Sequence, residues 1–285
     1  MSNGQPLDPA LYVVSTPIGS ADDITLRALH VLAQADVLAA EDTRRLRKLM
    51  DIHGIPLAGR RIVACHDHNE AASAQGLVAA IAEGKSVAYA SDAGTPLLAD
   101  PGFALARAVI AAGQDVRSAP GASALLAALA VAGMPVDRFL FAGFPPVKEG
   151  ARATFLADVM ATQATLILYE SPKRVARTLT AIADVEPERE VALCRELTKR
   201  FEEVRRGTAR DLADALAAEA DPKGEIVLVL APPAPRSLSD ADVDALLRDA
   251  LTRGSVKDAA SEVAAATGQP RKGLYARAQA LKDAR

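Results

Sequence analysis

The stretch LYVVSTPIGSADDITLRALHVLAQADVLAAE (residues 11–41) contains the repeating unit of the expected fold. Residues 11–15 are rich in β-branched and aromatic side chains, which is typical of a strand, and residues 24–35 carry apolar side chains at helical spacing. Residues 36–41 are again short and apolar. A strand, a helix and a second strand in this order predict a βαβ crossover and a parallel pair of strands.

The same alternation continues as far as residue 119. Further strands are predicted at 61–66, 86–92 and 115–119, and further helices at 44–54, 70–84 and 103–113. We therefore expect a first α/β domain over residues 10–119 with a mainly parallel sheet.

A second α/β domain is expected over residues 120–233. Strands are predicted at 139–144, 165–171, 189–197, 202–207 and 225–232, with helices at 149–162, 173–184 and 209–220. The strand at 202–207 follows its predecessor with no room for a crossover helix, so this second sheet should be mixed and partly antiparallel.

A Pro-rich linker (231–237) precedes three short amphipathic segments separated by Gly and Pro. Helices this short need one another to bury their apolar faces, so we expect a small C-terminal three-helix domain of helix-turn-helix size over 237–285. Its last stretch, 269–285, has a net charge of +4. That charge is compatible with either a solvated helix face or a contact to nucleic acid.

Composition excludes several classes of protein. The 285 residues hold 33 Lys and Arg against 36 Asp and Glu, so a globally basic nucleic-acid coat protein is excluded and any RNA contact must use a local patch. Cys65 and Cys194 form no motif, which makes a disulfide scaffold implausible. The N-terminus lacks a signal sequence, and the longest apolar run (124–134) is shorter than the ~20 residues that span a bilayer. We expect a cytoplasmic protein with no membrane partner.

Loops rich in turn formers follow three predicted strands, at the sheet edge where ligands collect in parallel sheets. STPIGSADDIT (15–25) contains no dinucleotide or P-loop signature, and it could be a plain turn in which Asp22 or Asp23 caps the next helix. SDAGTPLLADPG (91–102) is longer than a connector needs, and Asp92 at its start could accept hydrogen bonds from a ribose or bind an ammonium group. The alternatives are an Asx-turn for Asp92 and a helix cap for Asp100.

APGASAL (119–125) begins another helix, at whose N-terminus Ser123 and backbone N–H groups favour an anion such as a carboxylate. Simple capping by Ser123 would explain the same residues.

Charged residues gather in further motifs. YESPKR (169–174) and CRELTKRFEE (194–203) place carboxylates beside Lys and Arg, which suits a general base or a polyanion clamp but also an ordinary ion-pair network. EDTRRLRK (41–48) offers a phosphate-binding patch. HDHNE (66–70) lacks the further ligands of a zinc site, so no metal is expected.

Taken in order, these motifs resemble the tetrapyrrole methylase superfamily of S-adenosylmethionine-dependent methyltransferases. Within it, the chain is most similar to the members that methylate a ribose 2′-hydroxyl of ribosomal RNA. The resemblance covers about residues 11–285 and depends on VVSTPIGSADDITLRAL, AEDTRR, HDHNE, SDAGTPLLADPG, PGASAL, YESPKR, RELTKRFEEVRRG and KGEIVLVL.

The resemblance implies two α/β domains with the cofactor, S-adenosyl-L-methionine, in the cleft between them, and a homodimer. It implies a target cytidine in the decoding region of 16S rRNA, presented as rRNA or as the small ribosomal subunit. Cofactor contacts are implied for Pro17, Ile18, Gly19, Asp92, Gly94, Thr95, Ser123, Ala124, Tyr169, Leu193, Arg195, Glu225 and Ile226. The first loop, TPIGS, departs from the GxGxG-like loop of relatives that act on tetrapyrroles, which argues against a porphyrinoid substrate.

A ribose hydroxyl is a poor nucleophile, so a nearby base should remove its proton during attack. The candidate catalytic residues are Glu170, Lys173, Glu196 and Lys199, although catalysis by proximity alone remains an alternative. Two other functions stay open: a methylase of a corrinoid precursor, and a regulator whose tail binds DNA while its α/β body senses a nucleotide.

Overall fold

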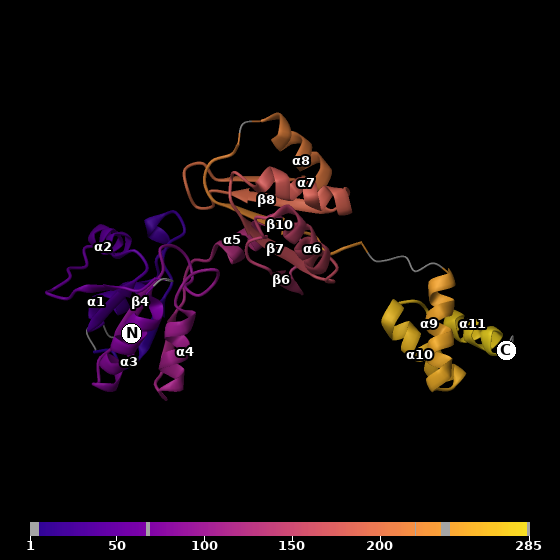
Figure 1. The fold of residues 1–285 in the computed structure, drawn as a ribbon, viewed down its shortest axis with the longest axis horizontal. Helices are drawn as coiled ribbons and strands as arrows, with labels where there is room; N and C mark the ends of the chain where they lie inside the picture. The colour runs from indigo at the N-terminus through magenta and orange to yellow at the C-terminus, as the bar shows by residue number, and fades with distance from the viewer. Residues whose placement is uncertain (1–5, 67–68, 220, 235–239, 284–285) are drawn as a thin grey trace. The chain divides into compact units, whose positions relative to one another are not determined.

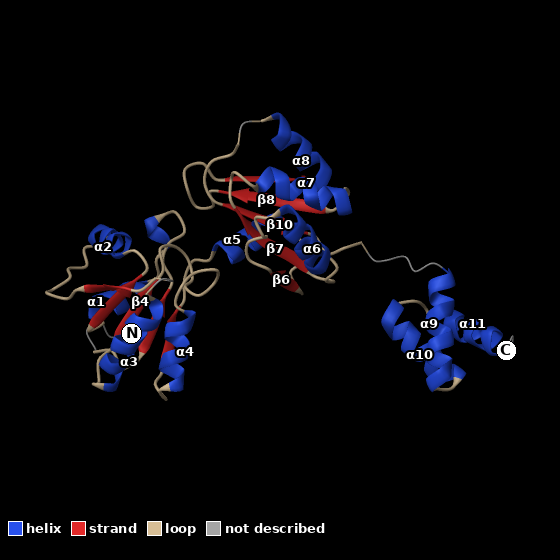
Figure 2. Ribbon diagram, in the orientation of Figure 1, coloured by secondary structure: helices blue, strands red, loops and turns tan. Residues whose placement is uncertain are grey.

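The structure is a computed structural model that describes residues 6–66, 69–219, 221–234 and 240–283. It divides into two compact units, residues 1–233 and 234–285, which are considered separately below. The first unit holds two β-sheets with their helices, and the second unit is helical (Figures 1 and 2).

The first sheet has the strand order β3-β2-β4-β1-β5, and every pairing in it is parallel, as the alternating pattern predicted. Its strands are β1 (Leu11–Val14), β2 (Val37–Ala40), β3 (Ile62–Ala64), β4 (Val87–Ala90) and β5 (Val116–Ala119). Its helices are α1 (Leu26–Gln34), α2 (Thr43–Ile52), α3 (Glu70–Ala82) and α4 (Phe103–Ala111), with a short 3₁₀ turn η1 (Ala21–Asp23) before α1.

The central strands of this sheet are buried on both faces, because helices cover both sides. Successive residues of a strand point to opposite faces. Accordingly, Leu11 and Tyr89 pack in a cluster with α3 and α4, whereas Tyr12 and Ala88 pack in a second cluster with α1 and α2. The packing on both faces fixes the sheet register and therefore the positions of the loops at its carboxyl edge.

The second sheet has the order β6-β7-β10-β8-β9 and is mixed, which confirms the expectation drawn from the missing crossover. β6 pairs with β7 in parallel, and the remaining pairings are antiparallel. Its strands are β6 (Phe139–Phe141), β7 (Thr165–Glu170), β8 (Glu190–Arg195), β9 (Glu203–Thr208) and β10 (Ile226–Leu230). Its helices are α5 (Ala124–Ala132), α6 (Glu149–Met160), α7 (Val175–Val185) and α8 (Ala209–Ala218).

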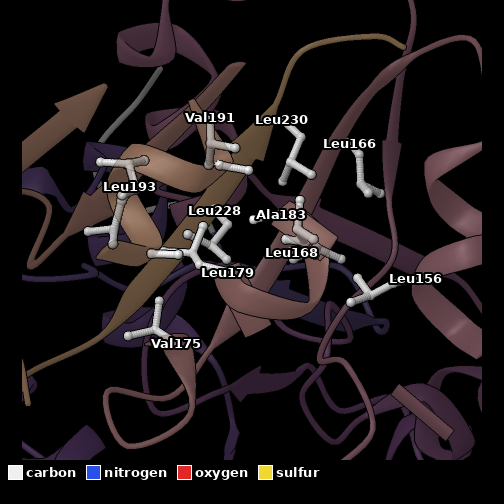
Figure 3. Packing of buried hydrophobic residues seen from close by; sticks show 14 of the residues in the cluster. Leu156, Leu166, Leu168, Val175, Leu179, Ala183, Val191, Leu193, Leu228 and Leu230 are labelled. Atoms are coloured by element: carbon white, nitrogen blue, oxygen red, sulfur yellow. The ribbon is translucent and has the colours of Figure 1, made fainter. Parts of the chain in front are cut away.

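The two faces of the second sheet have different covers. Leu168, Leu193 and Leu228 pack against α6, α7 and α8 in the cluster shown in Figure 3. The opposite face packs against α5, and Ile18 from the loop after β1 joins that cluster. Each fully buried side chain of this size contributes roughly 1.5–3 kcal/mol, so the first loop is anchored to the core of the second sheet.

The second unit consists of α9 (Asp240–Arg253), α10 (Val256–Thr267) and α11 (Arg271–Asp283), which share a small apolar core of their own. Ser255 and Asp258 form a capping box at the start of α10, and Gly268 ends it in the left-handed conformation. Arg277, one of the basic residues of the tail, bonds to Asp240 and Asp244 and so holds α11 to α9.

Two expectations about chemistry outside the site can be compared with the structure. Cys65 and Cys194 are buried and free, and burial raises the pKa of each thiol to about 11. In the described part of the chain, no helix is both long and apolar enough to cross a membrane.

Candidate functional site

The loops after β1 and β4 are joined by backbone hydrogen bonds at the carboxyl edge of the first sheet. Thr16 and Gly94 exchange both N–H···O bonds, with N···O distances of 2.9 and 3.0 Å. The Ser15 hydroxyl donates to Thr95 Oγ1 at 3.2 Å, and the Thr95 hydroxyl donates to the Ala122 carbonyl at 3.0 Å. The three loops singled out from the sequence therefore form one continuous structure.

These loops border a cavity of about 420 Å³, within the ~300–1,000 Å³ typical of small-molecule sites. We call it the loop cavity. Ten of the residues predicted for the site line it: Ile18, Asp92, Gly94, Thr95, Ser123, Ala124, Tyr169, Glu170, Glu225 and Ile226. Its walls come from both sheets of the first unit.

Other predicted site residues lie elsewhere. Pro17 and Gly19 border a neighbouring hollow. Leu193 faces the opposite side of its strand, in the cluster under α7 and α8. Arg195 bonds to Glu203 at 2.9 Å and to the Lys223 carbonyl at 3.2 Å instead of lining the cavity.

Tyr169 stands between the second sheet and α5. Its hydroxyl accepts the N–H of Leu125 at 3.1 Å, so it satisfies one of the backbone donors at the start of α5. Phe141 and Phe144 contact its ring edge-on, with centroids 4.8 and 5.6 Å away. Burial raises the pKa of Tyr169, partly opposed by the Leu125 hydrogen bond, so the phenol keeps its proton.

Ser123 occupies the N-cap position of α5 without using its side chain as a cap. Its buried hydroxyl lies near Tyr169 but makes no hydrogen bond of ordinary geometry. The first turn of α5 therefore presents a hydroxyl and partial positive charge to the cavity, which suits a carboxylate ligand.

Acidic residues dominate the wall contributed by the first sheet. Glu41, Asp92 and Asp100 line it, and Arg45 is the cation among the lining residues. Asp92 Oδ1 accepts the N–H of Asp42 at 2.9 Å, while Asp92 Oδ2 lies 3.3 Å from Arg45 Nε. A wall of this charge attracts a cationic ligand.

Glu196, Lys199 and Glu225 form a charged network at the edge of the cavity. Lys199 Nζ lies 2.8 Å from Glu196 Oε1 and 3.1 Å from Glu225 Oε2. The Lys199 contact lowers the pKa of Glu196. Burial alone would lower the pKa of Lys199, but the two carboxylates outweigh it and raise that pKa. Both groups are therefore charged at neutral pH, which makes each a weak proton acceptor.

Glu170 and Lys173 differ sharply in environment. Glu170 is buried, and its carboxylate accepts the Ser171 N–H at 2.7 Å and the Thr178 hydroxyl at 2.6 Å while pairing with Arg174. Such contacts position the β7–α7 loop. Lys173 is exposed and is not among the cavity-lining residues.

The loop cavity also includes residues that sequence reasoning did not assign to it, namely Glu41, Arg45, Asp100 and Phe144. Arg45 belongs to the basic segment interpreted as a phosphate patch, and no signal in the sequence indicated its contact with Asp92. The Glu70 carboxylate caps α4, accepting the N–H groups of Gly102 and Leu105 at 3.1 and 2.8 Å. Similarly, Thr25 caps α1 in place of Asp22 or Asp23.

No group of three or more His, Cys, Asp and Glu residues that could hold a metal ion occurs among the described residues. Of the HDHNE segment, residues 67 and 68 lie outside the described part of the chain.

Comparison with known proteins identifies the family of the chain. The family model of the tetrapyrrole (corrin/porphyrin) methylases matches residues 10–213, and that of the RsmI C-terminal HTH domain matches residues 237–282. The chain therefore belongs to the tetrapyrrole methylase family, whose methyl donor is S-adenosyl-L-methionine. Over its full length it is similar to proteins named ribosomal RNA small subunit methyltransferase I.

The relative from Mesorhizobium japonicum is 50% identical over 98% of this chain and 94% of its own length. The relative from Erythrobacter litoralis is 46% identical over 98% of each chain. Among solved structures, diphthine synthase has a TM-score of 0.62 at 16% identity, covering 78% of this chain and 90% of its own. Uroporphyrin-III-C-methyltransferase from Thermus thermophilus has a TM-score of 0.52 at 24% identity, covering 78% and 94%. These two likenesses show the fold alone.

The loop cavity fits the family's cofactor by its chemistry. S-adenosylmethionine carries a sulfonium, an ammonium and a carboxylate. The acidic wall with Asp92 and Asp100 complements the cationic groups, and the start of α5 with its unused Ser123 hydroxyl complements the carboxylate. Gly94 adopts a positive φ of 79°, and a Cβ there would lie 3.3 Å from Ile18 Cγ2. The loop after β4 thus approaches the first loop closely only because residue 94 is a glycine.

Proposed function

We propose that this chain methylates the ribose 2′-hydroxyl of a cytidine in the decoding region of 16S rRNA, acting in the cytoplasm as a homodimer. The observation that supports this most is the loop cavity of both sheets, in a chain 40–50% identical over nearly its full length to proteins named as small-subunit rRNA methyltransferases. The matching helical unit at the C-terminus supports the same substrate.

When bound in the loop cavity, the cofactor would supply a methyl group on a positively charged sulfur, which is a good leaving group, for transfer to the ribose 2′-oxygen; the hydroxyl proton would pass to water or a base. The residues of the chain bind and orient the reactants. Asp92, whose Oδ1 accepts the Asp42 N–H, presents a carboxylate to the cationic groups of the cofactor, and protonated Tyr169 holds the start of α5 in place. Fixed groups of this kind lower the barrier mainly through positioning.

The role of proton acceptor stays a prediction for each of the four candidates, Glu170, Lys173, Glu196 and Lys199. Glu196 and Lys199 contact each other, which favours their charged states. Glu170 is engaged in the contacts that position the β7–α7 loop. We therefore infer that positioning supplies more of the rate than a base from this group. Single-turnover methyl transfer by variants with alanine at each of the four positions tests this inference, and a loss larger than about a thousandfold without unfolding would identify a base.

The function itself is tested with S-adenosylmethionine that carries a tritiated methyl group. Purified protein should label 16S rRNA or the small ribosomal subunit, and mapping should place the label on a ribose 2′-oxygen. Labelling of a corrinoid precursor instead, or sequence-specific duplex DNA binding without turnover, would contradict the proposal.

A further inference from the structure

A second hollow, of about 290 Å³, lies directly beside the loop cavity. We call it the α2 hollow. The loop after β1 forms one wall with Pro17 and Gly19, and α2 forms the other with Leu49 and Ile52. His53 Nε2 lies 3.1 Å from the Ala21 carbonyl, so the end of α2 is held to the loop. The hollow is thus a formed feature of the first unit.

The α2 hollow and the loop cavity share Arg45 and Asp92. The two hollows therefore meet at the Arg45–Asp92 ion pair, whose N···O distance is 3.3 Å and in which Arg45 is exposed and Asp92 is partly buried. An ion pair with one partner this exposed is weak, about 0–1 kcal/mol, so a ligand with its own charges can displace Arg45 while Asp92 keeps its bond from the Asp42 N–H. The α2 hollow is therefore well placed for the ribose that receives the methyl group from a cofactor in the loop cavity.

A third, shallow hollow lies around the next face of α2 and is strongly basic. Arg44, Arg47, Lys48 and Arg61 border it, and Lys48 also borders the α2 hollow. Residues 45, 48, 49 and 52 follow helical spacing on one face, and residues 44, 47, 48 and 51 follow it on the adjacent face. Residues of α2 therefore border the loop cavity, the α2 hollow and this basic surface.

The cations of this surface are not equivalent. Arg44 pairs with Asp42 at 2.8 Å and Arg47 with Asp51 at 2.9 Å. In the described part of the chain, the side chains of Lys48 and Arg61 make no hydrogen bond or ion pair. Exposed, uncommitted cations are what a phosphate backbone requires.

Arg60, which also borders the basic surface, has a different role. It donates to the carbonyls of Leu57, Leu32, Ala35 and Pro56, and burial lowers its pKa. It holds the segment before β3 to the end of α1 and is not available to a ligand.

We infer that a single RNA strand follows α2, with the nucleotide to be methylated in the α2 hollow and its flanking phosphates on Lys48 and Arg61. This inference rests on the proposed function and specifies how its substrate is held. The hollow is close to the lower limit of small-ligand sites, roughly 300 Å³, so it accepts one nucleotide turned out of its stack. The apolar walls from Leu49 and Ile52 suit the face of a base, and the ribose then faces Arg45 and Asp92.

The phosphate contacts are tested with a double variant, Lys48→Gln with Arg61→Gln, in the full chain. The probe is a single-stranded RNA oligonucleotide carrying the target sequence, titrated at several salt concentrations. Removal of one phosphate-binding cation should reduce the slope of log Kd against log salt by about 0.7, so the double variant should show a reduction of about 1.4. Binding of S-adenosylmethionine, measured by calorimetry, should not change.

The matched control is Lys85→Gln. Lys85 is an exposed cation just before β4, at the amino edge of the same sheet, and it pairs with Glu83 at 2.8 Å. Its substitution changes the net charge equally per site but should leave the salt slope unaltered. An unaltered slope in the double variant, or an equal decrease per site in the control, overturns the inference.

The α2 hollow is tested by fluorescence, because the chain contains no tryptophan. Ile52→Trp places a single reporter at the exposed end of α2, and Val185→Trp places one at the exposed end of α7, on the second sheet. Saturating RNA should change the emission of the first variant at least severalfold more than that of the second. Equal changes, or none while RNA is bound, overturn the assignment of the hollow.

The two proposals fail in different ways. A protein that binds S-adenosylmethionine and methylates rRNA, but whose variants behave like Lys85→Gln, retains the proposed function and loses the RNA path along α2. A protein that transfers no methyl group to rRNA loses the proposed function, whatever its salt slope.

Discussion

The hydroxyl of Tyr169, on the second sheet, accepts the backbone N–H of Leu125 at 3.1 Å, and through this contact β7 holds the N-terminus of α5 beside the loop cavity. Strand β7 and helix α5, joined by two residues 44 positions apart in the sequence, thus shape one wall of the site.

Tyr169→Phe removes this acceptor and leaves a helix donor unsatisfied. We expect a loss of about 1 kcal/mol in the free energy of unfolding, measured in urea, because one hydrogen bond is removed. We also expect weaker S-adenosylmethionine binding by calorimetry. Tyr12→Phe, which removes the bond to the Asp8 carbonyl at 3.2 Å in the first sheet, is the control and should affect stability alone. Equal donor affinities in the two variants would contradict the role of Tyr169.

Gly94→Ala strains the loop after β4. Residue 94 has a positive φ, which costs a non-glycine residue about 1–2 kcal/mol, and the added Cβ would press on Ile18 at 3.3 Å. Gly113→Ala is the matched control, because its φ of 71° is similar and nothing lies within 4 Å of its Cβ position. Both variants should lose stability from the strained backbone, Gly94→Ala the more because of the Ile18 contact, and only Gly94→Ala should lose donor affinity by calorimetry. Similar donor affinities would show that the close approach of the loops is not needed.

Lys199→Arg separates a structural cation from a proton acceptor. The raised pKa of Lys199 keeps its ammonium charged at neutral pH, so an arginine should replace it with less than tenfold loss of single-turnover methyl transfer. If Lys199 acted as a base, the Lys199→Arg variant would lose methyl transfer, since arginine keeps its proton. A loss of a hundredfold or more at unchanged donor affinity would therefore contradict the structural role.

Lys199→Met should lower stability in a way that depends on pH. The pKa of Glu196 is depressed in the folded chain, so its contribution is present above the unfolded value, near 4.3, and is lost as the pH falls through the folded value. The stability difference from the parent, at most about 1 kcal/mol for an ion pair that water still reaches, should hold from pH 6 to 8 and shrink below about pH 4. Urea titrations at several pH values measure it. A difference that grows in acid would contradict this sign.

Deleting residues 237–285 removes the helical unit, whose core is its own. The remaining chain should bind S-adenosylmethionine as before, because the loop cavity lies within residues 1–233. Its RNA binding should weaken and depend less steeply on salt, since Lys257, Arg271, Lys272 and Tyr275 border a basic hollow of the deleted unit while Lys48 and Arg61 remain. RNA affinity identical to that of the full chain at every salt concentration would exclude a role in binding.

The sequence was sufficient to predict both sheets, because strand alternation and the missing helix between residues 197 and 202 are local signals. It also located the loop cavity, since the carboxyl ends of parallel strands share an edge. It could not show that Leu193 faces away from α5, because a strand buried on both faces has no polar alternation to mark its sides. It could not rank the four charged candidates either. Their roles depend on pairings such as Lys199 with Glu225, which lie in loops 26 residues apart in the sequence.

The anchoring of Ile18 in the core of the second sheet has a consequence for how ligands exchange. If the two sheets separated by a hinge motion, Ile18 would leave an apolar cluster in which it is only 7% exposed. That exposure would cost roughly 1.5–3 kcal/mol before any other contact broke. The demethylated cofactor should therefore leave through the opening of the loop cavity while the two sheets keep their relative positions. The turnover rate should then depend on local motion of the loops and not on separation of the sheets.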